Sequence, residues 1–360
     1  MSPSYLDDFN KVLRVGIERG ASDVHVKVAL PPIFRIDGRL VPLKDAPRYS
    51  AEDVTHLAHE IMGDERYRER FREHNDIDLA YGVGGLGRFR VNIFQQRGTL
   101  GMVFRLIPPA VKSFDELNLP PVLEKIAAEN RGLILVTGTT GTGKSTSLAA
   151  MIDDINKRIK GHILTVEDPI EFVHSRRNCL ISQREIGVHS PSFAAALHSA
   201  LREDPDVILV GELRDLETMS MAVTAAEMGI LVMGTLHTNG AAPTVDRLVN
   251  AFPADKQPHV RTMLSTSLRG VVSQQLIPKT DKQGRVAALE ILINTPAVAN
   301  LIRQGKMDQL ENAMQSGAGV GMRLMDSAIQ TLLDQRQITG KEAFKKAINK
   351  TRFEQYREAS

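Results

Sequence analysis

The segment GLILVTGTTGTGKS, residues 132–145, decides the fold of this 360-residue chain. Its first half is an unalternated apolar run, which is typical of a parallel strand covered on both faces. From Gly138 to Ser145 the segment matches the phosphate-binding pattern G-x-x-x-x-G-K-[S/T] at every fixed position. The residues that follow, TSLAAMIDDINKR, predict a helix. This strand, loop and helix together predict a binding site for a nucleoside triphosphate.

The residue types of the loop suit an anion. Glycines leave room for backbone N–H groups to turn inward, and the start of the following helix adds a favourable dipole. Lys144 is expected to reach the β- and γ-phosphates, and the Ser145 hydroxyl is expected to ligate Mg²⁺. We therefore predict that a nucleoside triphosphate and Mg²⁺ bind here. The predicted nucleotide-binding residues are Gly138, Thr139, Thr140, Gly141, Thr142, Gly143, Lys144, Ser145 and Thr146.

Three later segments repeat the apolar character of the first strand. They are HILTVED (162–168), DVILVGE (206–212) and ILVMGTLHT (230–238), with helix-like segments between them. This alternation predicts an α/β domain from about residue 122, built on a parallel sheet with helices on both faces.

Carboxylates end two of these predicted strands, where the carboxyl ends of a parallel sheet form a ligand crevice. Glu212 stands where a P-loop enzyme normally places its second acidic residue, so we predict that it is catalytic and also binds the metal. We predict a functional role for Glu167 as well, because a lone buried acid is costly. For Asp168 and Glu171, a helix cap or a salt bridge explains the residue equally well. By its local pattern alone, His237 in MGTLHTNG (233–240) fits a packed core histidine.

The first hundred residues follow a different pattern, which predicts a small α+β domain. Helical spacing covers residues 4–19, and another helix is expected from about Ala51. A hairpin is expected around Asp37-Gly38, and three β-rich runs cover 76–83, 87–94 and 99–107. Pro108-Pro109 then breaks the chain. The predicted organisation is an N-terminal domain (1–108), a linker (109–121), a P-loop core (122–293) and a helical C-terminal region (294–360).

The composition argues against several classes of protein. Basic and acidic residues number 45 and 43, so the net charge of +2 gives no electrostatic reason to expect nucleic acid as a partner. A RecA-like nucleic-acid motor is further disfavoured by an aromatic content of 5% without tryptophan. With Cys179 as the one cysteine, neither a disulfide framework nor a multi-cysteine zinc site is available. Since no apolar run is long enough to span a bilayer and the start lacks a signal-peptide layout, we expect a cytoplasmic protein.

Four motifs carry a family resemblance, and they occur in the order GTTGTGKST (138–146), TVEDPIEFVH (165–174), ILVGELRD (208–215) and GTLHTNGAAPTVDRL (234–248). Together they resemble the secretion-ATPase superfamily of type II secretion and type IV filament systems. Within it, the chain looks like the type IV pilus retraction ATPases (PilT/PilU-like), from GASDVHV near the N-terminus to the C-terminal helices. The resemblance implies a PAS-like N-terminal domain, a RecA-like P-loop ATPase domain with a helical C-terminal region, and a homo-hexameric ring.

The resemblance also implies roles for individual residues. Glu212 would be the catalytic Walker B glutamate, Glu167 would lie near the attacking water, and His237 would sense the γ-phosphate or a subunit boundary. Arginines of the N-terminal domain would complete the site, since a planar guanidinium suits a phosphate in its transition state. The arginines that match best are Arg90, Arg97 and Arg105, with Arg88 and Arg214 as further candidates. The alternative is that these arginines are outward-facing residues of an ordinary sheet.

The implied function is ATP-driven pilus retraction, in which pilin is depolymerised and cells twitch. The motor would act on an inner-membrane platform protein (PilC-like) and reach pilin only indirectly. It would lie in the cytoplasm, peripherally associated with the inner membrane at the pilus base, with another retraction ATPase as a possible partner.

Two departures from the retraction pattern leave alternatives open. The usual AIRNLIRE reads AVANLIRQ here (297–304), and the usual AETGH reads AEMGI (226–230). The first change leaves room for an accessory, PilU-like ring paralogue that assists another retraction ATPase. A pilus extension or type II secretion ATPase is the other alternative. Those enzymes usually add N-terminal domains and a four-cysteine metal element, which this chain lacks.

Overall fold

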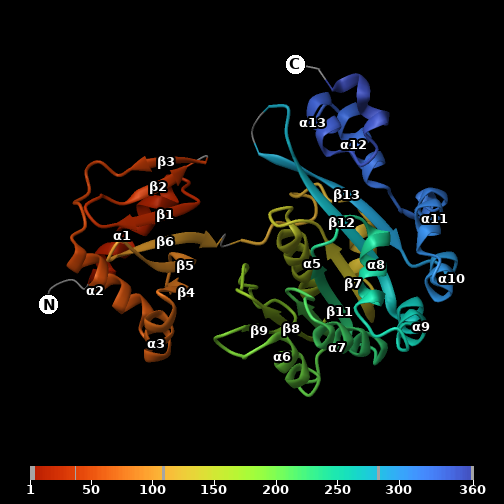
Figure 1. The fold of residues 1–360 in the computed structure, drawn as a ribbon, viewed down its shortest axis with the longest axis horizontal. Helices are drawn as coiled ribbons and strands as arrows, with labels where there is room; N and C mark the ends of the chain where they lie inside the picture. The colour runs from red at the N-terminus through yellow and green to blue at the C-terminus, as the bar shows by residue number, and fades with distance from the viewer. Residues whose placement is uncertain (1–4, 37, 108–109, 282–283, 358–360) are drawn as a thin grey trace. The chain divides into compact units, whose positions relative to one another are not determined.

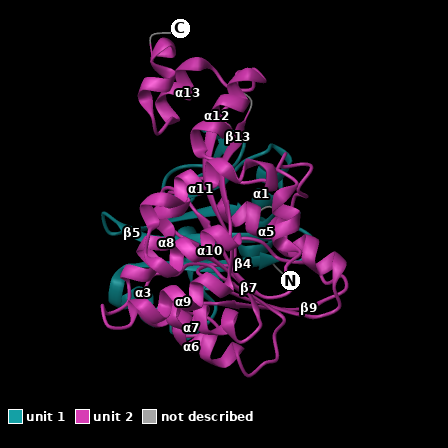
Figure 2. Ribbon diagram, turned by 90° about the vertical axis from the view of Figure 1, so that its right-hand side faces the viewer, with its two compact units in different colours: residues 1–110 teal, residues 111–360 magenta. Residues whose placement is uncertain are grey.

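The computed structural model describes residues 5–36, 38–107, 110–281 and 284–357. Figure 1 shows the fold as a ribbon, and Figure 2 colours its two compact units, residues 1–110 and 111–360. Asp37, Pro108 and Pro109, where the sequence predicts a turn and a break, lie outside the described residues.

Unit 1 is an antiparallel sheet with helices, as the sequence predicts. Its strand order is β3-β2-β1-β6-β5-β4, and the expected hairpin is the pair β2 and β3. Along β5, Phe89, Val91 and Ile93 are buried in the core, while the residues between them lie on the opposite face. The elements are α1 (Tyr5–Glu18), β1 (Asp23–Lys27), β2 (Ile33–Ile36), β3 (Arg39–Pro42), α2 (Ala51–Met62), α3 (Glu65–His74), β4 (Asp76–Val83), β5 (Gly87–Gln96) and β6 (Thr99–Ile107).

Unit 2 is built on a seven-stranded sheet of order β13-β12-β7-β11-β10-β8-β9. All neighbours pair in parallel except β12 and β13. The four predicted strands are β7, β8, β10 and β11, and they form the centre of this sheet. The strands are β7 (Gly132–Thr137), β8 (His162–Glu167), β9 (Leu180–Glu185), β10 (Val207–Val210), β11 (Leu231–Leu236), β12 (Leu268–Pro278) and β13 (Arg285–Ile293).

Helices cover both faces of this sheet, as a doubly covered parallel sheet requires (Figure 1). One face packs on α4 and α5, and the other packs on α6 to α9 and on two later helices, α10 (Pro296–Gln304) and α11 (Leu310–Ser316). Successive residues of each central strand point to opposite faces, and both faces are buried. This explains why these strands read as continuous apolar runs. These helices are α4 (Val122–Ala127), α5 (Lys144–Arg158), α6 (Phe193–Ala200), α7 (Leu216–Glu227), α8 (Ala241–Asn250) and α9 (Gln257–Ser267).

The C-terminal region is helical, as predicted, and packs as part of unit 2. Its helices are α10 (Pro296–Gln304), α11 (Leu310–Ser316), α12 (Met325–Asp334) and α13 (Gly340–Lys346). At the start of unit 2 in the sequence, Phe114 and Leu119 from the predicted linker are buried in the same core cluster as residues of α4 and α5. This part of the predicted linker therefore packs as part of unit 2.

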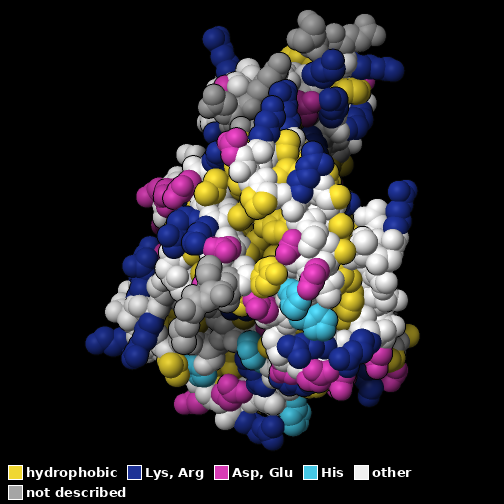
Figure 3. Space-filling model, turned by 90° about the vertical axis from the view of Figure 1, so that its left-hand side faces the viewer, with side chains coloured by type: hydrophobic (Ala, Val, Ile, Leu, Met, Phe, Trp, Pro, Cys, Tyr) yellow, Lys and Arg dark blue, Asp and Glu magenta, His cyan; other side chains and the backbone are white. Residues whose placement is uncertain are grey.

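The surface carries both signs of charge. On the face drawn in Figure 3, Lys and Arg side chains are interspersed with Asp and Glu side chains, which agrees with the near-zero net charge. Among the described helices, none is both long and apolar enough to cross a membrane.

Candidate active site

The phosphate-binding loop joins β7 to α5, and its glycines adopt conformations that other residues avoid. Gly138, Gly141 and Gly143 have φ values of 139°, 80° and 90°. A Cβ atom on Gly138 would lie 2.5 Å from the carbonyl oxygen of Gln274 on β12, so this position also requires glycine for space. The loop is thus built closely against its neighbouring strand.

A cavity of about 370 Å³ opens beside this loop at the carboxyl ends of the parallel strands. Its wall includes six of the predicted loop residues together with Glu167, Glu212 and His237 from the ends of β8, β10 and β11, whereas the predicted Gly138, Thr139 and Thr142 are not part of this wall. The wall also contains Phe193, Leu276 and Arg285, which no sequence motif identifies. The lining residues that bear on the chemistry are Thr140, Gly141, Gly143, Lys144, Ser145, Thr146, Glu167, Asp168, Glu171, Glu212, Thr235, His237 and Arg285.

The Lys144 ammonium lies within the loop. Its Nζ atom donates hydrogen bonds to the carbonyl oxygens of Gly138, at 2.8 Å, and Thr139, at 3.1 Å. Burial lowers the pKa of Lys144, while the charges of Glu212 and Glu171 act in the opposite direction. These contacts hold a cation where inward-turned loop amides would meet a phosphate group.

Glu212 lies two residues beyond β10 and has two basic partners. Arg214 Nη2 lies 2.6 Å from its Oε2 atom, and His237 Nε2 lies 3.2 Å from its Oε1 atom. Burial opposes ionisation, but the hydrogen bond from Arg214 and the charges of His237 and Arg214 outweigh it, so the pKa of Glu212 is lowered. The residue is therefore a carboxylate at the cavity wall.

His237 follows β11 directly and faces the cavity. Its side chain is 38% exposed, which is not the environment of a packed core histidine. The strand end beside it is fixed by two threonines. Thr137 Oγ1 donates to the Thr238 carbonyl at 2.9 Å, and the Thr235 hydroxyl donates to the Gly211 carbonyl. The ends of β7, β10 and β11 are thereby tied together around His237.

Glu167 at the end of β8 has neutral partners. Thr165 Oγ1 and Gln183 Nε2 donate to its Oε1 atom at 2.7 and 3.2 Å, and the Glu171 N–H donates to Oε2 at 3.4 Å. Burial raises the pKa of Glu167, and the hydrogen bonds from Thr165 and Gln183 oppose the rise. The pKa values of Glu167 and Glu212 are therefore shifted in opposite directions.

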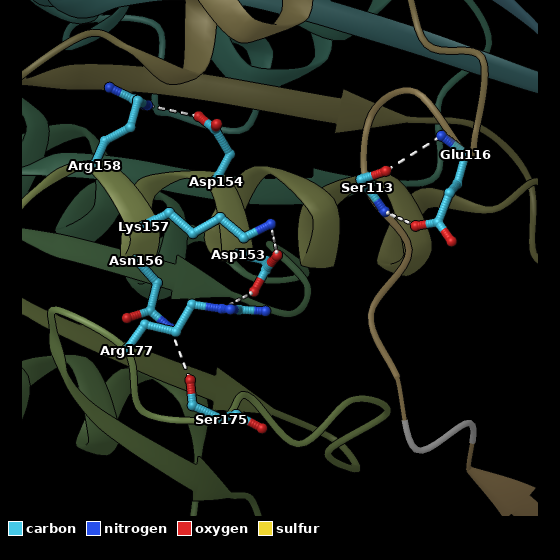
Figure 4. Close-up of polar contacts among 9 residues, drawn as sticks. All are labelled: Ser113, Glu116, Asp153, Asp154, Asn156, Lys157, Arg158, Ser175 and Arg177. Atoms are coloured by element: carbon cyan, nitrogen blue, oxygen red, sulfur yellow. Dashed lines mark hydrogen bonds and ion pairs between the residues drawn. The ribbon is translucent and has the colours of Figure 1, made fainter.

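The segment that follows Glu167 is attached to the helix that follows the phosphate-binding loop. Figure 4 shows the Asn156 side chain of α5 donating to the Ser175 carbonyl, at 2.8 Å, and Arg177 paired with Asp153 at 3.0 Å. Asp153 also pairs with Lys157 at 2.6 Å. These contacts fix the acidic segment to the same helix that presents Lys144.

Arg90, Arg97 and Arg105 lie in unit 1, whereas the further candidate Arg214 lies in unit 2 beside Glu212. Arg90 on β5 and Arg105 on β6 are register partners, and Arg105 Nε lies 2.9 Å from Oδ1 of the buried Asp23. Arg90 Nη2 lies 3.5 Å from an oxygen of Asp78. Arg97 is exposed in the turn between these strands, with a φ of 50°. Their participation in the nucleotide site stays a prediction.

The oxygen ligands in the cavity fit Mg²⁺ better than a softer metal. Mg²⁺ is usually bound through one or two protein oxygens together with phosphates and waters, which the Ser145 hydroxyl and the ionised Glu212 can supply. Among the described residues, no group of three or more His, Cys, Asp and Glu side chains forms a closed metal cage.

Comparisons with known proteins agree along nearly the whole chain. A family model described as Type II/IV secretion system protein matches residues 4–332. The chain is 48% identical over 340 residues to the type IV pilus retraction ATPase PilT of Pseudomonas aeruginosa, covering 94% of this chain and 98% of that protein. It is 42% identical over 336 residues to the type IV pilus ATPase PilU of the same organism, covering 93% and 87%. A crystal structure of the pilus retraction motor PilT with bound ADP superposes with a TM-score of 0.90 at 44% identity, covering 96% of this chain and 98% of that one.

Proposed function

The chain belongs to the type II/IV secretion system ATPases, and we propose that it is a motor that hydrolyses ATP to power type IV pilus retraction. One observation carries the proposal. The cavity beside the phosphate-binding loop collects Lys144, Glu167, Glu212 and His237 from four separate parts of the sequence. This arrangement occurs in a chain that matches a retraction motor over almost its full length.

In the proposed reaction, the Lys144 ammonium exchanges its carbonyl contacts for the β- and γ-phosphate oxygens of ATP. Glu212, held ionised by its two basic partners, accepts a hydrogen bond from the attacking water and orients it. His237 donates to the γ-phosphate and loses that contact when the phosphate leaves. Ser145 and Glu212 would hold Mg²⁺, which when bound would neutralise charge on the phosphates.

The proposed working form is a homo-hexamer in the cytoplasm, at the inner-membrane base of the pilus. Arg90, Arg97 and Arg105 from the N-terminal domain of the same or a neighbouring subunit complete the site. Closure of the N-terminal domain on the ATPase domain when ATP binds, and release after hydrolysis, would deliver force to an inner-membrane platform protein. Pilin is reached indirectly, and nucleic acid is no partner.

An accessory role beside another retraction ATPase is the second candidate, and α10 is the feature that favours it. This helix carries the AVANLIRQ departure. Ala299 is half-buried, and the exposed Gln304 donates to Asn300 on the same helix at 3.2 Å. The usual arginine and glutamate are thus replaced by uncharged residues on a helix associated with retraction rather than with ATP turnover.

Turnover measurements test the ATPase assignment. We expect Lys144→Ala to lose nucleotide binding, and Glu212→Gln to bind ATP but hydrolyse it about 10²- to 10⁴-fold more slowly. The exposed Glu217→Gln in the first turn of α7 is the matched control and should keep the wild-type rate. Wild-type turnover by Glu212→Gln would show that the catalytic assignment is wrong. Unaltered turnover by Arg97→Ala would remove that arginine from the site.

Complementation separates the two candidate functions. The chain is expressed in a retraction-deficient strain, with and without the partner ATPase. Twitching restored by this chain alone would exclude the accessory role, whereas twitching that requires the partner would support it.

A further inference from the structure

Glu290 is a buried carboxylate outside the cavity of the proposed active site. It lies on β13 and is 6% exposed. Its Oε1 atom accepts a hydrogen bond from the Ala241 N–H at 2.6 Å, and its Oε2 atom accepts one from the Met325 N–H at 3.1 Å. One side chain therefore binds two backbone groups that are distant in sequence.

Both of these backbone groups belong to the first residues of helices. Ala241 begins α8 and Met325 begins α12, which Figure 1 shows on the same side of the molecule as β13. Neither helix has a side-chain cap of its own, since Gly240 and Leu324 occupy the cap positions. A carboxylate at two helix N-termini satisfies unpaired N–H groups and meets two favourable dipoles. Burial raises the pKa of Glu290, and the two N–H donors oppose that rise.

The α8 contact lies directly beside the histidine segment. Gly240, three residues after His237, donates its N–H to Ser273 Oγ at 3.0 Å, and Ala241 follows. A Cβ atom on Gly240 would lie 3.4 Å from Glu290 Oε1, and its φ is +99°. The segment from His237 to Ala241 is thus held on one side by Thr137 and on the other by the β12–β13 hairpin.

We propose that Glu290 is a positioning residue that couples the histidine segment to the C-terminal helical region. The inference rests on the proposed function, in which His237 contacts the γ-phosphate. A shift of residues 237–241 on loss of that contact moves the Ala241 N–H, and the shared carboxylate carries the change to the start of α12. The N-terminal ends of α8 and α12 would thus shift together between two arrangements. Both the bound nucleotide and the C-terminal region would influence which arrangement is favoured.

Glu290→Gln tests the coupling with little change of shape. Its one amide oxygen can accept only one of the two bonds in the present geometry, because the amide nitrogen only donates. Asp326→Asn is the matched control. The Asp326 carboxylate also accepts two backbone N–H bonds, from Ile348 at 2.7 Å and Asn349 at 2.8 Å, but both come from the C-terminal region.

The assay combines steady-state turnover with amide hydrogen exchange of the full-length protein in ADP and in a non-hydrolysable ATP analogue. In the wild type, we expect the amides of Ala241 and Met325 to respond together to the change of nucleotide. In Glu290→Gln, we expect kcat to fall about tenfold with KM for ATP nearly unchanged, and the response of α12 to be lost. Asp326→Asn should keep both kcat and the response.

Two results would overturn the coupling while nucleotide still binds. In the first, amide hydrogen exchange of the wild-type protein changes with nucleotide at Ala241 but not at Met325. This result does not depend on any variant folding. The other is a Glu290→Gln protein with wild-type kcat and an intact response of α12, even if its Tm is lower. Absence of analogue binding to the wild type, measured by calorimetry, would instead overturn the proposed function and the coupling with it.

Discussion

Replacing Thr165 by valine tests how strongly one hydroxyl group limits the rise in the pKa of Glu167. Thr165 lies on β8 with no exposed surface, and its Oγ1 atom donates to Glu167 Oε1 at 2.7 Å. Burial raises the pKa of Glu167, and this hydrogen bond is the foremost interaction that opposes the rise. Valine keeps the shape and suits a buried strand, but it cannot donate.

The size of the effect follows from the loss of a hydrogen bond to a charged acceptor, which is worth about 1.5–3 kcal/mol. Because 1.36 kcal/mol corresponds to one pH unit, the pKa of Glu167 should rise by about one to two units. If turnover requires ionised Glu167, the acid limb of the kcat profile moves to higher pH by the same amount. The raised pKa of Glu167 also makes the free energy of unfolding depend on pH. A carboxyl whose folded-state pKa is raised above its unfolded value stabilises the fold at low pH, and that contribution is lost as the pH rises through the folded-state pKa.

The assay is ATP turnover at saturating ATP between about pH 5.5 and 9, with unfolding measured at the two ends of the range. Thr331→Val in α12 is the control, since it removes a hydroxyl that donates to the Ser327 carbonyl at 2.9 Å, away from the cavity. An acid limb that stays at its wild-type position in Thr165→Val would refute the reasoning. Glu167 would then have a structural role rather than a role in turnover as a carboxylate.

Two further predictions concern the loop and unit 1. Gly138→Ala should abolish nucleotide binding in a calorimetric titration, because the new Cβ atom would clash with a β12 carbonyl, whereas Gly319→Ala, with open space around it, should bind normally. Burial opposes ionisation of Asp23, yet hydrogen bonds from Ser22 and Arg105 keep its pKa below the usual 3.8. The stability that Asp23 adds is therefore present above that value and lost at lower pH. Asp23→Asn should make the free energy of unfolding of unit 1 depend less on pH in the acid range. An unchanged pH dependence would show that Asp23 contributes nothing there.

The central part of the fold could be predicted from the sequence because its signals are local. Continuous apolar runs mark β7, β8, β10 and β11, and the loop motif marks the turn from β7 into α5. Since parallel strands end at one edge of a sheet, three polar residues at strand ends could be expected to meet. The cavity that holds Glu167, Glu212 and His237 agrees with this expectation.

The rest depends on partners that no local pattern reveals. β12 contains Ser273 and Gln274, which are both buried, so its sequence does not read as an apolar strand. Their side-chain partners come from distant elements, for example Ser147 Oγ, which donates to Gln274 Oε1 at 2.8 Å from α5. Glu290 is missed for the same reason, since its two donors are backbone groups of α8 and α12.

Three glutamates of unit 2, Glu167, Glu212 and Glu290, show why position in the sequence does not determine chemistry. Charged donors surround Glu212, neutral donors surround Glu167, and backbone N–H groups surround Glu290. Only charged partners outweigh burial, so the pKa of Glu212 is lowered, while the pKa values of the other two are raised. As the pH falls, Glu167 therefore takes up a proton before Glu212 does. A pH profile of Glu212→Gln that keeps the wild-type acid limb, at a much lower rate, is the result this division of roles requires.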